Sequence, residues 1–139
     1  MKRVSTFLMV LLLLCAMTPW SSAAQANEMQ PLWTYVTKVN GTLDISNTGM
    51  AKVTAKGEAD SKGVTKITVS ASLQQLKGGT WKELKSWTSS SNGTSVSLSE
   101  KSWSVAHGYS YRVVATVKAY TGTALLEQGS SIQNFGYFA

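Results

Sequence analysis

The stretch Tyr109–Tyr120, "YSYRVVATVKAY", decides the fold, because its apolar side chains recur at every second position. Such a period of two is typical of a β-strand with one buried face. If the pairing of this strand slipped by one residue, all of these apolar side chains would face solvent. The register of the strand is therefore well specified. The stretch therefore predicts a central core strand, with Arg112 on the opposite face. The stripe comprises Tyr109, Tyr111, Val113, Ala115, Val117 and Ala119.

The same alternation extends to other parts of the chain. One stripe runs through Val53, Ala55, Gly57 and Ala59, and another through Ile67, Val69, Ala71 and Leu73. Residues 125–135 differ, because neither of their two sets of alternate residues is wholly apolar. We predict seven strands, near 33–46 (interrupted at Gly41), 50–59, 64–76, 80–89, 94–99, 108–120 and 124–135.

Short turn signals separate these strands, and no segment shows a helical stripe. Glycine supplies positive φ angles, and Asn or Asp bonds its own backbone, as at Gly78-Gly79, Asn92-Gly93 and Thr121-Gly122. The serine-rich stretch 88–95 is expected to be a mobile hairpin loop. Seven short strands indicate an all-β fold, a single antiparallel β-sandwich of immunoglobulin or fibronectin type III kind. A small closed barrel is the alternative, because spacing does not reveal strand order.

Residues 1–26 have the features of a secretory signal peptide. Lys2 and Arg3 precede an apolar run, and small residues lead to a predicted cleavage site after Ala26, with Ala24 as the second choice. The apolar run falls short of the roughly 20 residues that span a bilayer, so we expect no integral membrane segment in the mature form. We therefore predict a secreted, extracellular protein whose single domain is residues 27–139.

Composition limits what the secreted form can do. Removal of residues 1–26 leaves 11 basic and 7 acidic residues, which gives a net charge of +4. It also removes the only cysteine, Cys15. Disulfides and cysteine-based metal sites are therefore excluded. The lysines are spread over nearly every strand, which is typical of a soluble surface and predicts no nucleic-acid partner. A weak attraction to anionic wall polymers or lipid surfaces stays open.

Two stretches resemble a known family. "LQQLKGGTWKELKSW" (73–87) and "GYSYRVVATVKAY" (108–120) resemble short secreted proteins of Gram-positive bacteria that are classified as a domain of unknown function. The resemblance implies a signal peptide followed by one all-β domain, and it brings no activity or site residues. The Tyr-X-Tyr-Arg-Val run is also similar to the penultimate strand of fibronectin type III domains, which implies that Tyr109 or Tyr111 hydrogen-bonds back across the preceding loop.

Catalytic chemistry would depend on His107, the only histidine. A general base needs a partner within hydrogen-bond reach, and a triad needs a nucleophile and an orienting carboxylate. His107 precedes Gly108 where a turn is required, and histidine tolerates unusual turn angles, so we interpret it as a solvated turn residue. No carboxylate pair stands out, and Gly78-Gly79 has too few glycines to cradle phosphate. We expect no enzyme, no catalytic residues, no cofactor and no metal site.

Tryptophans are the best indication of binding. Trp81 follows a two-glycine turn at the start of a predicted strand. Glu83 and Lys85 would lie on the same face of that strand as Trp81, and burying two charges would be costly. We expect Trp81 to be exposed at the end of the sheet while Leu84 packs inward. The candidate binding surface is Trp81, Lys82 and Trp87, and the expected partner is a cell-wall polymer, a glycan or an extracellular protein. The alternatives are that the rings fill the core and that the protein is a structural or matrix component without a specific ligand.

Overall fold

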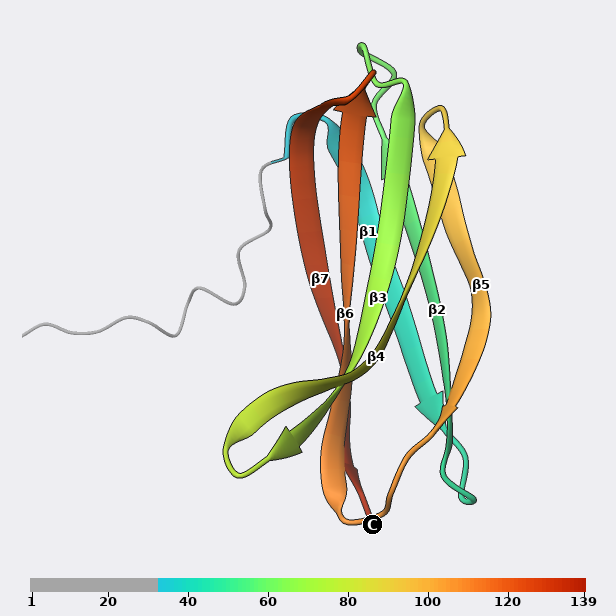
Figure 1. Cartoon of the computed structure of the whole chain (residues 1–139), viewed down its shortest axis with the longest axis vertical. Coiled ribbons are helices and arrows are strands. Elements are labelled where there is room, and N and C mark those ends of the chain that lie inside the picture. The colour runs from blue at the N-terminus through green and yellow to red at the C-terminus, as the bar shows by residue number, and fades with distance from the viewer. Residues whose placement is uncertain (1–32) are drawn as a thin grey trace, which may run out of the picture. The chain divides into compact units, whose positions relative to one another are not determined.

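The computed structural model describes residues 33–139, and the predicted signal peptide and its cleavage site lie outside them. Two antiparallel sheets are present, with strand orders β1-β2-β5 and β4-β3-β6-β7. Figure 1 shows them as two layers, which confirms the β-sandwich and makes the closed barrel wrong. The strands are β1 (Val36–Ile45), β2 (Met50–Ala59), β3 (Lys66–Lys77), β4 (Thr80–Asn92), β5 (Ser95–Ser104), β6 (Tyr109–Thr121) and β7 (Ala124–Phe138).

The core is built on β3 and β6, and the Tyr109–Tyr120 stripe predicts the central position of β6. Val113 of β6 pairs with Leu73 of β3, and both side chains are 0% exposed. Ala115 pairs with Ala71 in the same register, again with both side chains buried. Burial of each large apolar side chain contributes about 1.5–3 kcal/mol. The prediction that Tyr109–Tyr120 is a central core strand is therefore confirmed, and β3 is its partner.

Glycines on the inner face of the three-stranded sheet let the two sheets approach each other. A Cβ on Gly57 would overlap the side chain of Val117, and one on Gly41 would lie 3.1 Å from the Cβ of Ala115. The predicted interruption at Gly41 is wrong, because β1 runs through this residue without a break. Gly41 is required for close packing of the sheets, not for a turn.

Strand β7 explains why its sequence shows no clean stripe. Its pairing with β6 shifts twice, and Leu126 and Phe135 are the residues that the pairing skips. Both pack against the core. A β-bulge places two residues opposite one and changes which parity faces inward. The inward-facing positions of β7 therefore change between odd-numbered and even-numbered residues along the strand.

The serine-rich stretch is strand, and the predicted loop at 88–95 is wrong. β4 extends to Asn92 and β5 begins at Ser95, so only Gly93 and Thr94 connect them. Ser89 and Ser91 pair with Val69 and Ile67 of β3. The backbone ladder to β3 holds this segment, and small hydroxyl side chains are acceptable on a strand at the edge of the sheet.

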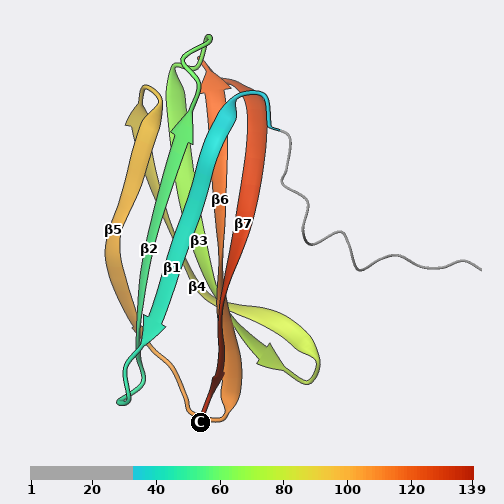
Figure 2. The same cartoon turned by 180° about the vertical axis from the view of Figure 1, so that it is seen from behind.

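The closed end of the β3–β4 hairpin turns away from the other strands. Figures 1 and 2 show this end extending outward from the two layers, from opposite sides of the molecule. The pairing of β3 with β4 shifts between Leu73 and Gln74, at the point where the hairpin leaves the sandwich. A bulge increases local twist, which accounts for the change of direction.

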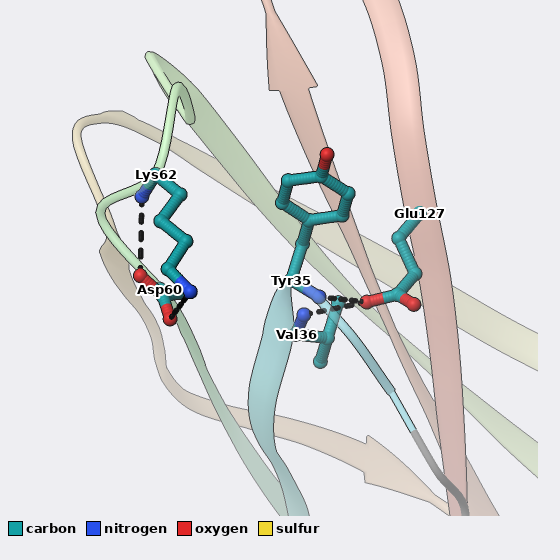
Figure 3. Close-up of polar contacts among 5 residues, drawn as sticks. All are labelled: Tyr35, Val36, Asp60, Lys62 and Glu127. Atoms are coloured by element: carbon teal, nitrogen blue, oxygen red, sulfur yellow. Dashed lines mark hydrogen bonds and ion pairs between the residues drawn. The ribbon is translucent and has the colours of Figure 1, made fainter.

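A single carboxylate fastens the start of β1 to β7. Glu127 accepts hydrogen bonds from the backbone N–H groups of Thr34 (2.8 Å), Tyr35 (2.5 Å) and Val36 (2.7 Å). Figure 3 shows the bonds from Tyr35 and Val36. Desolvation raises the pKa of Glu127, but the three backbone hydrogen bonds outweigh it and hold that pKa below its ordinary value. This ionised group therefore joins the edge strands of the two sheets.

The segment before β1 is also held by an aromatic contact. Trp33 lies directly over Gly129 of β7, where an added Cβ would be 2.6 Å from Trp33 Cε2. Trp33 packs against the core cluster. This indole therefore serves the fold, and glycine at position 129 makes room for it.

Candidate functional site

Trp81 is placed by a tight turn. Lys77 pairs with Thr80, and Gly78 and Gly79 between them have φ angles of 61° and 80°. Two positive φ angles in a two-residue loop are the requirement of a type I′ hairpin turn, which suits the twist of paired strands. Trp81 is thus the second residue of β4 and pairs with Leu76. Its side chain is half-buried, so the expectation of an exposed indole is wrong; the guanidinium of Arg112 covers part of the ring.

A bulge at Leu84 divides β4 into two parts that face opposite ways. Before the bulge Glu83 pairs with Gln74, and after it Lys85 pairs with the buried Leu73. Directly paired residues share a face of the sheet. Trp81 and Glu83 therefore lie on the outer face of the four-stranded sheet, the face turned away from the three-stranded sheet, and Lys85 and Trp87 lie on the inner face.

This bulge removes the conflict that the sequence presents. With a regular strand, Trp81, Glu83, Lys85 and Trp87 would share one face, and two charges would face the core with two rings. In the structure Trp87 is half-buried and packs against the core, as Leu84 does. The charges of Glu83 and Lys85 lie on opposite sides of the hairpin.

A connected set of polar contacts surrounds Trp81 on the outer face. The guanidinium of Arg112 lies over the indole, with its Cζ 4.2 Å from the ring centroid. Arg112 Nε donates to Gln74 Oε1 at 2.7 Å, and Gln74 Nε2 donates to Ser72 Oγ at 3.2 Å. Ser72 Oγ in turn donates to Glu83 Oε1 at 2.6 Å. We call Trp81, Arg112, Gln74, Ser72 and Glu83 the outer platform.

The outer platform presents a ring and a cation in a fixed relation. A guanidinium stacked on an indole keeps its charge and its remaining N–H donors. Within residues 33–139, Arg112 donates its Nε to Gln74, and its half-buried side chain leaves both Nη groups without a hydrogen-bond partner from the protein. The arrangement suits noncovalent recognition, since it offers an aromatic surface beside hydrogen-bond donors.

The three predicted site residues do not form one surface. Trp81 belongs to the outer platform, whereas Lys82 pairs with Gln75, whose Nε2 donates to Tyr111 Oη at 3.0 Å on the inner side. Trp87 packs against the core. Sequence reasoning missed Arg112 as the partner of Trp81. The sequence did place Arg112 on the face opposite the buried Tyr109–Tyr120 stripe. Only the pairing of β3 with β4 and with β6 brings Arg112 to Trp81.

Tyr111 identifies which tyrosine bonds back across the preceding loop. Its Oη donates to the carbonyl oxygen of Ala106 at 2.6 Å, and its side chain is 0% exposed. A buried phenol requires hydrogen-bond partners, and Ala106 and Gln75 supply them. Tyr109 lies closer to the surface, with Lys77 Nζ 5.9 Å from its ring centroid.

His107 lies in the connection between β5 and β6, as predicted, and is exposed. Its ring stacks on Phe138 at a centroid distance of 4.2 Å, and its Nδ1 lies 2.8 Å from the backbone oxygen of Ala139. These contacts join the β5–β6 turn to the end of β7. Neither contact brings a nucleophilic side chain to the imidazole.

The described part of the chain offers little besides the outer platform. A hollow of about 260 Å³ lies on the three-stranded sheet, which is below the roughly 300–1,000 Å³ of typical ligand pockets. Among residues 33–139 no three metal-ligating side chains gather. No helix in this range is long and apolar enough to cross a membrane. The outer platform is thus the best candidate for a functional site.

Comparison with known proteins gives no relative. No family model, no curated protein and no solved structure matches the chain.

Proposed function

We propose that this chain is a secreted, non-enzymatic binding module that recognises an extracellular partner through the outer platform. The observation that carries the proposal is the stacking of Arg112 on Trp81 on the outer face of the four-stranded sheet, where both side chains are half-buried. The partner class is a cell-wall polymer, a glycan or another extracellular protein. Secretion is inferred from the leader in residues 1–26.

The energetics of the outer platform favour a role in recognition. Trp81 does not belong to the inner face, and the core is already filled by the stripes of β3 and β6. Arg112 is held by Gln74, so little side-chain freedom would be lost when a partner binds. Aromatic and arginine side chains dominate interface energetics when they are well ordered.

We further propose that the fold is of immunoglobulin or fibronectin type III kind and that the chain belongs with the Gram-positive secreted proteins that it resembles. A three-stranded β1-β2-β5 sheet opposite a four-stranded β4-β3-β6-β7 sheet supports the first part. The hydrogen bond from Tyr111 to Ala106 supports it as well, since a tyrosine near the start of the penultimate strand is a feature of such sandwiches.

Retention on Gram-positive cell walls and on immobilised polysaccharides tests the proposal. Trp81→Ala should keep a cooperative thermal transition and lower retention about 30-fold, which corresponds to an anchor of about 2 kcal/mol. Tyr120→Ala is the matched control, because Tyr120 is a half-buried ring with Lys66 Nζ 5.4 Å from its centroid, on the same sheet but at the opposite end of β3 from Trp81. Unchanged retention by folded Trp81→Ala, or an equal loss in both variants, would refute a role for the outer platform.

A structural or matrix component is the second candidate, and one observation favours it. Leu125, Ile132 and Tyr137 are 50%, 54% and 66% exposed, and all three lie on β7, at the edge of its sheet. Edge strands with apolar side chains are prone to pair with other chains. Concentration-dependent self-association of the pure protein, lost in Ile132→Lys, would support this candidate.

A further inference from the structure

Three lysines of the β3–β4 hairpin share its inner side. Lys82 pairs with Gln75, and Lys85 pairs with Leu73. Lys77 follows Gln75 by two positions, so it faces the same way. We call Lys77, Lys82 and Lys85 the hairpin lysine face; it lies on the side opposite Trp81.

The hairpin lysine face is accessible because the hairpin leaves the sandwich. All three lysines are exposed, although the same parity faces the core farther along β3. Figures 1 and 2 show the closed end of the hairpin turned away from the three-stranded sheet. The inner side of the hairpin is therefore exposed to solvent near the turn, and it contributes to the core where the strands join the sandwich.

No carboxylate of the hairpin neutralises this face. Between Leu73 and Trp87 the only acidic residue is Glu83, and it lies on the opposite side, bonded to Ser72. Within residues 33–139 the one salt bridge joins Lys62 to Asp60, so no carboxylate lies within 4.0 Å of the three ammonium groups of this face. The three-stranded sheet differs, because its Lys38 and Lys52 stand opposite Glu58 and Asp44.

Aromatic rings hold two of these ammonium groups without removing their charge. Lys77 Nζ lies 5.9 Å from the centroid of Tyr109, and Lys85 Nζ lies 5.1 Å from that of Trp103. Cation–π contact orients a cation and leaves it positive, whereas an acidic partner would cancel it. The result is an ordered row of positive charge with no internal counterion.

We propose that the hairpin lysine face binds an extended polymer that carries phosphate groups. Along the regular strand β3, the row runs from Lys77 to the level of Leu73, which pairs with Lys85. At about 3.3 Å per residue it is roughly 13 Å long, too long for one small anion. Lysine binds phosphate as a compact point charge and needs no fixed bidentate geometry, which suits the successive groups of a flexible polymer. The inference goes beyond the outer platform and does not depend on it.

A polymer fits this face better than a lipid surface does. Membrane-surface binding combines cations with apolar side chains that enter the interface. Most large apolar residues exposed in the described range, Met50, Leu125, Ile132 and Tyr137, lie on β2 and β7. The remaining one, Trp103, has Lys85 over its ring.

Titration with long-chain inorganic polyphosphate tests the proposal, with polyglutamate and anionic phospholipid vesicles at equal charge concentration as comparison probes. The wild type should bind polyphosphate most tightly, with affinity that falls steeply as salt rises. The triple variant Lys77→Gln, Lys82→Gln, Lys85→Gln should lose at least tenfold in affinity and show a shallower salt dependence. The triple variant Lys38→Gln, Lys52→Gln, Lys56→Gln, which removes the same charge from the three-stranded sheet, should lose less than threefold.

Equal losses in the two triple variants would overturn the proposal, since net charge alone would then explain binding. Equal or tighter binding of vesicles or polyglutamate would overturn the choice of a phosphate polymer. Thermal unfolding of each variant checks that the fold is intact. Trp81→Ala should bind polyphosphate as the wild type does, so this inference and the proposed function can fail separately.

Discussion

Arg112 and Trp81 come from different strands, β6 and β4, and meet on the outer face of the four-stranded sheet with 4.2 Å between the guanidinium carbon and the ring centroid. Strand β3 lies between them, and its Gln74 holds the guanidinium in place. The pair therefore reports directly on the register of three strands.

A double-mutant cycle measures this contact. Trp81→Ala and Arg112→Ala should each lower the free energy of unfolding modestly, and the double variant should lose less than their sum, with a coupling of about 0.5–1 kcal/mol. Urea unfolding of the four proteins gives the value. Strict additivity would mean that the two side chains do not stabilise each other in solution.

The inward register of β6 predicts a large difference between adjacent residues. Val113→Asp would place an unpaired charge where the side chain is 0% exposed, at a cost of several kcal/mol, comparable with the stability of a whole domain. Arg112→Ser, on the opposite face, should cost much less. Melting temperatures that fall equally in the two variants would contradict this register.

Tyr111→Phe should lower the free energy of unfolding by about 1–2 kcal/mol, because it removes the hydrogen bond to Ala106 and the acceptor for Gln75. Tyr109→Phe is the control on the same strand and should change it by less than about 0.5 kcal/mol. Denaturant unfolding distinguishes the two. A larger effect at Tyr109 would assign the loop-spanning bond to the other tyrosine.

Acid should weaken the junction of β1 with β7. The pKa of Glu127 is lower in the folded protein than its ordinary value, so the ionised carboxylate stabilises the fold above the unfolded-state pKa. This contribution is lost as the pH falls from that value, about 4.3, through the lower folded-state pKa. Stability measured by urea unfolding between about pH 3 and pH 6 should show this slope.

Glu127→Gln should lower stability at neutral pH by about 1–2 kcal/mol and flatten the acid dependence, because the charge-assisted bonds to three backbone N–H groups weaken. Glu100→Gln, at an exposed position on β5, provides the comparison. An acid slope that is the same in wild type and Glu127→Gln would assign the effect to other carboxylates.

Processing gives a prediction that does not depend on the fold. The secreted protein should begin at Asn27, or at Gln25 if the earlier site is used, and should contain no thiol. Intact mass of the protein from culture supernatant decides between these. A lipid-modified Cys15 or a retained leader would contradict a freely secreted form.

Much of the sandwich follows from local alternation. The Tyr109–Tyr120 stripe and the Ile67–Leu73 stripe are regular strands, so parity alone identifies their buried faces, and His107-Gly108 is the turn that its residue types predict. The Thr88–Ser95 stretch has no apolar period, and its composition suggested a loop. Its pairing with β3 makes it strand, and that pairing is a nonlocal property.

The sequence by itself determined which residues of β3 and β6 are inside, because a period of two needs no knowledge of the rest of the chain. Only the tertiary structure decided where that period breaks. The bulge at Leu84 exchanges the faces of β4, and the two irregularities at Leu126 and Phe135 do so on β7. A bulge forms where paired strands must twist to follow their neighbours, so its position depends on the whole sheet. That is why Trp81 meets Arg112 on one side of the hairpin while the lysines beside it gather on the other.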